Sequence, residues 1–144
     1  VIYSLIDSEV ESLVIVNRSL QRAEELATYF AQRDKGIRMV AKPRFDESIE
    51  YDLIINCTPI GMRYGTMEMM LPVPADMIRS DTLVYDLVYN PMVTPLLQEA
   101  TKRGAKIVGG LHMLIYQGAL GFQLWTGKVA PVSVMFKAAE KALM

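Results

Sequence analysis

Short apolar runs alternate along the chain with segments of helical periodicity. Five such runs, most of them rich in β-branched residues, end at polar or turn-forming residues, as buried strands of a parallel sheet do. They are Leu13–Val16, Ile37–Val40, Leu53–Asn56, Thr82–Asp86 and Lys106–Val108. Strands separated by helices predict βαβ units, so the expected fold class is α/β, with a doubly wound parallel sheet.

The predicted helices have recognisable ends. After the first strand, Ser19 stands where an N-cap residue would, and Gly36 stands where a helix would end. Between them, apolar residues recur at helical spacing: Ala23, Leu26, Ala27 and Phe30. Three further helices are predicted over Thr94–Arg103, Leu111–Trp125 and Val132–Leu143, with Pro131 opening the last and irregular chain over Met62–Pro74.

The first residues indicate a chain that starts inside a helix. Val1 is not a methionine, and Val1–Ile6 has helical character with no capping residue before it. We therefore expect residues 1–144 to form one domain that is incomplete at its N-terminus.

Composition excludes several classes of protein. The net charge is −1 at pH 7, and the basic residues are scattered, whereas a nucleic-acid partner requires a basic surface. No apolar run approaches the ~18 residues of a membrane span. Cys57 is the only cysteine, which excludes an internal disulfide and suits the reducing cytoplasm. The sequence leaves oligomeric state open, a homodimer included.

In a doubly wound sheet, ligands bind beyond the carboxyl ends of the strands. After the first strand, the position that faces the adenosine ribose holds no acid. Instead Arg18 and Arg22 lie one helical turn apart, behind Asn17 and beside Ser19 at a helix N-terminus. Two guanidinium groups and the helix dipole favour an extra phosphate, and therefore NADP over NAD. Two solvated arginines on a helix face remain the alternative.

The ends of the third and fourth strands carry further polar groups. Thr58 offers a hydroxyl beside Pro59, although an ordinary turn explains this pair equally well. Cys57 has no evident base nearby, so we expect a buried, inert thiol. Tyr89 lies past the fourth strand, where its hydroxyl either reaches a polar ligand or simply meets water.

The fifth strand ends in a glycine pair. Gly109 and Gly110 allow the backbone to approach a planar ring closely, and Met113 and Gln117 share one face of the helix that follows. The only histidine, His112, has no acidic neighbour in the sequence to orient it, and we assign it no role.

Taken together, these segments resemble shikimate dehydrogenases. Glutamyl-tRNA reductases share a segment like Asn17–Ser19, but the run from Asn56 to Met62 and the helix that bears Gln117 distinguish this chain from them. Within the first matching segment, Ser19 stands where shikimate dehydrogenases more usually have threonine. The matching segments are Val14–Ser19 with Arg22 and Ala23, Ile55–Met62, Tyr85–Tyr89, Thr94–Leu97, Gly110–Leu114, Gln117–Ala119 and Trp125–Gly127. The resemblance implies a Rossmann-like domain of an enzyme that reduces 3-dehydroshikimate to shikimate with NADPH, in the cytoplasmic pathway to chorismate and the aromatic amino acids.

The resemblance also implies roles for individual residues. Four would hold the adenosine 2′-phosphate: Asn17, Arg18, Ser19 and Arg22. Thr58 would line the crevice along the cofactor, and the backbone of Leu87 and Gly110 would meet the nicotinamide, with Met113 nearby. Tyr89 and Gln117 would hydrogen-bond the substrate. No metal is implied.

The family's first strand, glycine-rich loop and N-terminal substrate domain, with its catalytic lysine and aspartate, have no counterpart in the chain. We therefore expect no catalytic residue here and no activity from residues 1–144 alone. Two alternatives stay open, a non-catalytic nucleotide-binding module and a quinate-active relative.

Overall fold

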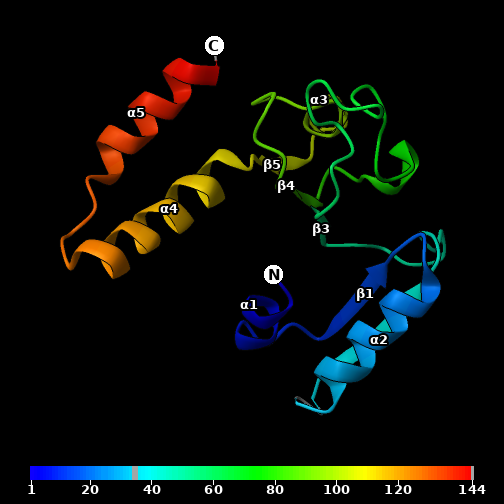
Figure 1. Ribbon diagram of the computed structural model, residues 1–144. Helices are drawn as coiled ribbons and strands as arrows, with labels where there is room; N and C mark the ends of the chain where they lie inside the picture. The colour runs from blue at the N-terminus through cyan, green and yellow to red at the C-terminus, as the bar shows by residue number, and fades with distance from the viewer. Residues whose placement is uncertain (34–35, 144) are drawn as a thin grey trace. The chain divides into compact units, whose positions relative to one another are not determined.

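The computed structural model describes residues 1–33 and 36–143. The chain divides into two compact units, Val1–Ile49 and Glu50–Met144 (Figure 1). Each unit has its own parallel sheet, of order β1-β2 in the first and β3-β4-β5 in the second. The five predicted strands and their parallel pairing are confirmed, and the strands are divided between two sheets.

The first unit is built around a βαβ arrangement. Its elements are α1 (Ile2–Asp7), β1 (Ser12–Val16), α2 (Leu20–Ala31) and β2 (Arg38–Lys42). The two strands pair from Ser12 beside Arg38 to Val16 beside Lys42, so their carboxyl ends lie side by side. Helix α2 buries one face, made of Ala23, Ala27 and Phe30. The ring of Tyr3 in α1 packs edge-on against Phe30, with centroids 5.0 Å apart.

The predicted end of α2 at Gly36 is wrong, because the helix ends at Ala31. The backbone N–H of Arg33 turns back to the carbonyl of Phe30 at 3.0 Å, which tightens the chain out of the α-helix. After Phe30 the next residues are exposed, so a longer helix would bury no further apolar surface. Residues 34–35 lie outside the described part.

The second unit centres on β4. Strand β4 (Leu83–Asp86) lies between β3 (Leu53–Asn56) and β5 (Lys106–Val108). Its side chains alternate, and Val84 and Asp86 are both fully buried. The carboxyl ends of β3 and β4 are in register, with Asn56 beside Asp86.

Among the described residues, four helices complete the second unit. They are the 3₁₀-helix η1 (Ala75–Met77), α3 (Pro95–Lys102), α4 (Leu111–Thr126) and α5 (Val132–Leu143). Helix α3 buries Leu96, Leu97 and Ala100, and Thr94 caps its N-terminus by accepting the N–H of Leu97 at 3.3 Å. The sequence did not predict η1, whose single turn is too short for a periodic signal.

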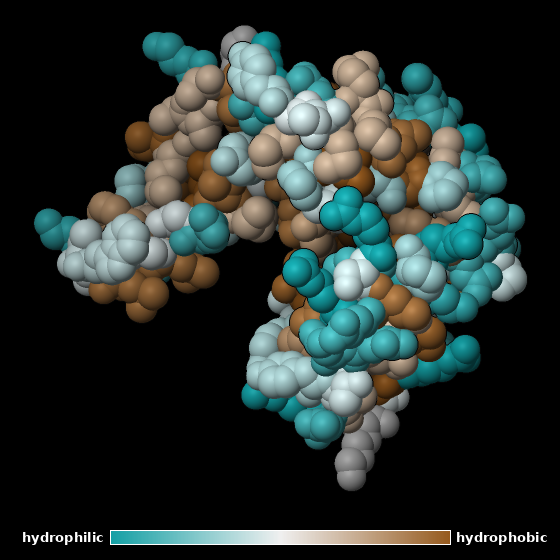
Figure 2. Space-filling model, turned by 45° about the vertical axis from the view of Figure 1, so that its right-hand side comes forward, coloured by the Kyte–Doolittle hydropathy of each residue, from teal (hydrophilic) through white to brown (hydrophobic). Residues whose placement is uncertain are grey.

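Helix α4 buries only part of its apolar surface. Leu111, Ile115 and Ala119 are buried, and α4 ends at Gly127, whose φ of 68° only glycine adopts freely. Hydrophobic residues, brown in Figure 2, also lie on the surface. On α4 the most exposed large apolar side chains are Leu124 and Trp125, with accessible fractions of 84% and 88%. In the part of the chain that the structure describes, no helix is both long enough and apolar enough to span a bilayer.

Candidate functional site

The residues predicted to bind a 2′-phosphate follow β1. The Asn17 N–H donates to the carbonyl of Lys42 at 3.1 Å, which continues the pairing of β1 with β2 by one residue. The side-chain oxygen of Asn17 accepts the Ser19 N–H at 2.9 Å. This short turn makes Ser19 the N-cap residue of α2, as predicted, although the Ser19 side chain makes no cap hydrogen bond. Asn17 therefore positions the start of the helix.

Arg18 and Arg22 flank this helix start, and both are exposed. Among the described residues, neither guanidinium has an ion-pair or hydrogen-bond partner. The N-terminus of α2 contributes backbone N–H groups and a positive dipole end beside them. Two unpaired cations at a helix N-terminus form a site that can hold an anion.

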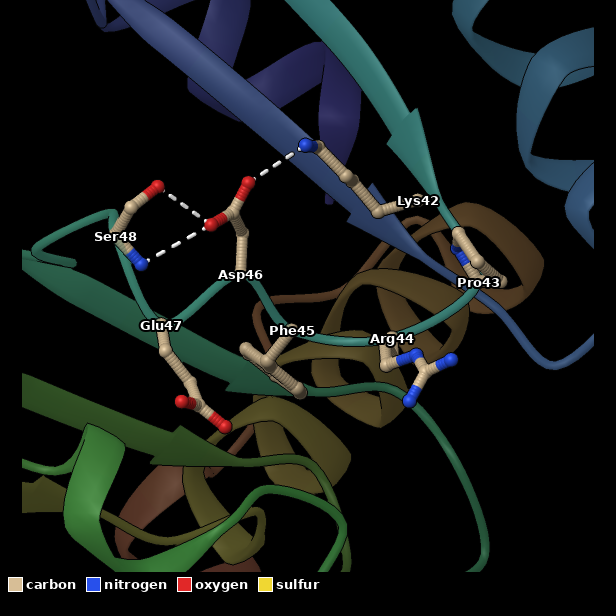
Figure 3. Close-up of a pocket in the computed structure, with 7 residues that line it drawn as sticks. All are labelled: Lys42, Pro43, Arg44, Phe45, Asp46, Glu47 and Ser48. Carbon is tan, nitrogen blue, oxygen red and sulfur yellow. Dashed lines mark hydrogen bonds and ion pairs between the residues drawn. The ribbon is translucent and has the colours of Figure 1, made fainter.

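A hollow of about 370 Å³ lies beside the same edge of the sheet, where β2 ends (Figure 3). Its polar centre is Asp46, whose carboxylate accepts Lys42 Nζ at 2.6 Å and the hydroxyl of Ser48 at 2.6 Å. These hydrogen bonds hold the pKa of Asp46 well below its usual range. None of the predicted site residues lines the hollow, whose wall is Lys42, Pro43, Arg44, Phe45, Asp46, Glu47 and Ser48.

In the second unit, Asn56 organises the loop after β3. Asn56 is buried, and its side-chain oxygen accepts both the N–H of Thr58 at 3.0 Å and the Thr58 hydroxyl at 2.7 Å. Its amide nitrogen donates to the Ile60 carbonyl at 3.1 Å. Thr58 itself is exposed, as a ligand-contacting residue must be.

The prediction that Cys57 is buried is wrong. The thiol lies on the surface, because β3 ends at Asn56 and the turn that Asn56 stabilises carries the next residues outward. Surrounding protein atoms still displace part of its hydration, and this desolvation raises the pKa of Cys57. A raised pKa lowers the thiolate fraction, in agreement with an inert thiol.

Asp86 ends β4 and links three segments. One carboxylate oxygen accepts Asn56 Nδ2 at 2.9 Å and the Val88 N–H at 3.0 Å, and the other accepts the Thr94 hydroxyl at 2.6 Å. The loop after β3, the loop after β4 and the N-terminus of α3 thus share one buried carboxylate.

Two further contacts hold these loops together. The N–H of Arg63 donates to the Asn90 carbonyl at 2.8 Å. Gly61, at a φ of 89°, brings the loop after β3 close to α3, so that an added Cβ would lie 3.6 Å from the Cβ of Thr94. These contacts therefore join the two loops at the carboxyl edge of β3 and β4.

The predicted nicotinamide contacts, Leu87 and Gly110, also meet. A Cβ on Gly110, the N-cap residue of α4, would collide with the carbonyls of Leu87 and Val88. Tyr89 is exposed just beyond them. Gln117 is exposed and Met113 half-buried on α4.

His112 points elsewhere, because its ring packs against Phe136 of α5 with centroids 5.1 Å apart. In the described part of the chain, no cluster of three or more histidine, cysteine, aspartate or glutamate side chains is arranged to hold a metal ion.

Comparison with known proteins shows which family this chain resembles. Residues 110–140 match the family model described as the Shikimate 5'-dehydrogenase C-terminal domain. A shikimate dehydrogenase (NADP(+)) of Dehalococcoides mccartyi is 42% identical over 135 residues, covering 91% of this chain and 46% of the relative. That of Methanopyrus kandleri is 43% identical over 146 residues, covering 98% of this chain and 50% of the relative.

The chain resembles the C-terminal half of the shikimate dehydrogenases. It spans about half the length of the curated relatives it matches. Solved structures agree with the assignment. A shikimate dehydrogenase in complex with NADP+ superposes with a TM-score of 0.80 at 37% identity, covering 92% of this chain and 47% of that one. The Thermus thermophilus enzyme in complex with NADP(H) and shikimate gives 0.79 at 36% identity, with coverages of 98% and 49%.

These neighbours confirm the α/β, Rossmann-like fold class of this chain. The predicted site residues fall into two sets, one in each unit. Within the second unit, the structure joins Thr58 to the loop of Leu87–Tyr89 through two residues that the sequence analysis did not select, Asn56 and Asp86. The signal was available: an amide and a carboxylate end two neighbouring strands, where buried polar residues require partners.

Proposed function

We propose that this chain is the NADP-binding part of an enzyme that reduces 3-dehydroshikimate to shikimate with NADPH, within the pathway to chorismate and the aromatic amino acids. The observation that carries the proposal is the pair of arginines without partners in the described structure, Arg18 and Arg22, at the end of β1 in a family whose members are named for NADP(+). No carboxylate occupies this position to accept a ribose hydroxyl and repel a phosphate.

The cofactor supplies the hydride, and the residues of this chain bind and orient it. Arg18 and Arg22 hold the 2′-phosphate, and the turn formed by Asn17 and Ser19 sets the direction of α2 behind it. At the other end, Gly110 supports the fit, because the space where a Cβ would stand is filled by the carbonyls of Leu87 and Val88. This close approach brings the backbone of Leu87 and Gly110 together where we place the nicotinamide, one helical turn before Met113.

Tyr89 and Gln117 are the proposed substrate ligands. Both side chains are exposed. Tyr89 lies in the loop after β4, and Gln117 lies in the second turn of α4. A phenol and an amide hydrogen-bond hydroxyl and carboxylate oxygens without adding a charge. The substrate is a small molecule, and the scattered basic residues argue against a nucleic acid.

We further propose that the remaining parts of the enzyme are supplied from outside this chain. Among the described strands, β1 pairs only with β2, and β3 pairs only with β4. A Rossmann sheet has a further strand, followed by a glycine-rich loop. That strand, and a substrate domain with the catalytic lysine and aspartate, would fill the half of the relatives that this chain does not cover. The single cysteine favours a cytoplasmic location.

The test is an assay of the full-length gene product with shikimate and quinate, each with NADP+ and NAD+. We expect NADP+-dependent oxidation of shikimate to be the fastest of the four reactions. Faster oxidation of quinate with NAD+ would contradict the proposal. It would favour a quinate-active enzyme instead, like the quinate dehydrogenase of Corynebacterium glutamicum in complex with NAD, which is 28% identical to this chain. Nucleotide binding without turnover of either substrate would favour a non-catalytic module.

A further inference from the structure

We propose that Asn56, clamped by Asp86, is a positioning residue that leaves Thr58 with a hydrogen-bond acceptor, and no donor, to offer the bound nucleotide. This inference rests on the proposed NADP site. It specifies which chemical groups of the nucleotide Thr58 can contact.

The clamp begins at Asp86. Its carboxylate is fully buried, and no ion pair among the described residues includes it. A carboxylate accepts hydrogen bonds and donates none, so each group that faces it must be a donor. The Thr94 hydroxyl, which caps α3, donates to one carboxylate oxygen at 2.6 Å, and the Val88 N–H at 3.0 Å and Asn56 Nδ2 at 2.9 Å donate to the other.

Asn56 has only one orientation that satisfies its surroundings. Its Nδ2 faces two acceptors, Asp86 and the carbonyl of Ile60, and so uses both of its hydrogens. Its Oδ1 faces the N–H of Thr58, which can only donate, and the Thr58 hydroxyl at 2.7 Å. A flipped amide would oppose like groups on both sides. The buried side chain, 4% accessible, therefore has every donor and acceptor engaged.

The orientation of Asn56 determines the hydroxyl of Thr58. Because Asn56 Oδ1 can only accept, the Thr58 hydroxyl must donate its single hydrogen to it. The same oxygen accepts the Ile60 N–H at 3.2 Å. One lone pair remains. Thr58 is exposed, so this lone pair is what the residue presents to a ligand.

A remaining acceptor selects among the groups of a dinucleotide. Ribose hydroxyls and the carboxamide N–H of nicotinamide can donate to it. Phosphate oxygens cannot, and they would be repelled by it. We infer that Thr58 contacts a ribose or the carboxamide and does not belong to the phosphate-binding part of the site.

The experiment measures dissociation constants for NADPH and steady-state kinetics with shikimate in the full-length protein. Thr58→Val removes the acceptor, Thr58→Ser keeps it, and Asn56→Ala removes the group that fixes its direction. We expect Thr58→Val and Asn56→Ala each to weaken NADPH binding about tenfold, the effect of one hydrogen bond, and Thr58→Ser to stay within about twofold of wild type. Should Asn56→Ala not fold, Asn56→Ser replaces it, since a serine hydroxyl cannot reach both Asp86 and Thr58.

A double-mutant cycle separates positioning from general destabilisation. If Asn56 acts through Thr58, the variant that combines Asn56→Ala with Thr58→Val should bind NADPH about as weakly as Thr58→Val alone, since both changes remove the same contact. Asp86→Asn is the conservative variant. Its amide oxygen can still accept from Asn56 and Val88 while its nitrogen faces Thr94, so NADPH binding should remain within about twofold of wild type.

Thr82→Val is the control for stability. Thr82 is as fully buried as Asp86, and its hydroxyl donates to the Tyr51 carbonyl at 2.9 Å. Thr82 precedes β4, however, and so lies at the opposite end of that strand from Asp86. It should lower the melting temperature without changing NADPH affinity. Full affinity in Thr58→Val, additive losses in the double variant, or an Asp86→Asn loss as large as that of Asn56→Ala would overturn the inference while the wild type stays active. An inactive wild type would overturn the proposed function, and this inference with it.

Discussion

Gly110 lies so close to Leu87 that no side chain fits between them. A Cβ added to Gly110 would stand 2.5 Å from the carbonyl carbon of Leu87 and 2.8 Å from the carbonyl oxygen of Val88. Because these contacts are with backbone, they cannot be relieved by a rotamer change. The N-terminus of α4 is thereby held against the loop after β4, where the proposed nicotinamide and substrate contacts converge.

Replacing Gly110 with alanine should therefore affect both stability and cofactor binding. Forcing α4 away from the loop should cost about 1–3 kcal/mol in the free energy of unfolding, measured by denaturant titration of the full-length protein. The KM for NADPH should rise in the same variant. Gly121→Ala is the matched control on α4, since a Cβ added to Gly121 would lie 3.9 Å from the Trp125 ring, an ordinary van der Waals contact. Equal stability of the two variants would contradict this packing.

Tyr89 and Gln117 should act on the substrate and spare the cofactor. We expect Tyr89→Phe and Gln117→Ala to raise the KM for shikimate by about tenfold or less, the value of a neutral hydrogen bond, without changing the dissociation constant of NADPH. Initial-rate kinetics with each ligand varied in turn provide the measurement. If neither variant changes the kinetics with shikimate, the residues do not contact it.

Cys57 should be dispensable and slow to react. Desolvation raises the pKa of its thiol, so little thiolate is present at neutral pH although the side chain is exposed. Alkylation by iodoacetamide at pH 7 should be slower than that of glutathione and should accelerate as the pH rises. Cys57→Ser should retain wild-type kcat. Rapid alkylation that abolishes activity would show that the thiol has a role in catalysis or binding.

The hydrogen bonds of Asp46 make a pH-dependent contribution to stability. Lys42 and Ser48 hold the pKa of Asp46 below its usual value, so the contribution is present above the unfolded-state pKa of about 3.9 and is lost as the pH falls through the folded-state pKa. Asp46→Asn should therefore lower the melting temperature at pH 7. The difference from wild type should shrink in strong acid, and a difference that does not vary with pH would be inconsistent with this assignment.

Periodicity and turn residues predicted the strands and most helix ends, because those signals are local. Strand β3 and helix α5 have the predicted bounds, and Thr94 caps α3 with its own side chain. The end of α2 was missed because burial beyond Phe30, rather than the glycine at 36, decides where that helix stops. The exposure of Cys57 depends on the turn that Asn56 stabilises, which no apolar pattern encodes.

The polar network of the second unit was the larger omission. The hydrogen bonds that connect Asp86 to Asn56 and Thr94 join residues that are 30 and 8 positions apart in the sequence. Such partners become visible only when the register of β3 with β4 is known. A buried acid that ends a strand signals that partners must exist, without saying which residues supply them.

Cofactor selectivity is the most direct test of the account, because it depends on Arg18 reaching a phosphate that only NADPH carries. Dissociation constants for NADPH and NADH should be measured for the full-length protein, for Arg18→Ala and for Arg38→Ala, an exposed arginine at the amino end of β2. We expect Arg18→Ala to weaken NADPH by about 1.5–3 kcal/mol and leave NADH nearly unchanged, while Arg38→Ala affects neither. Equal losses for the two nucleotides in Arg18→Ala would contradict the assignment of a 2′-phosphate site.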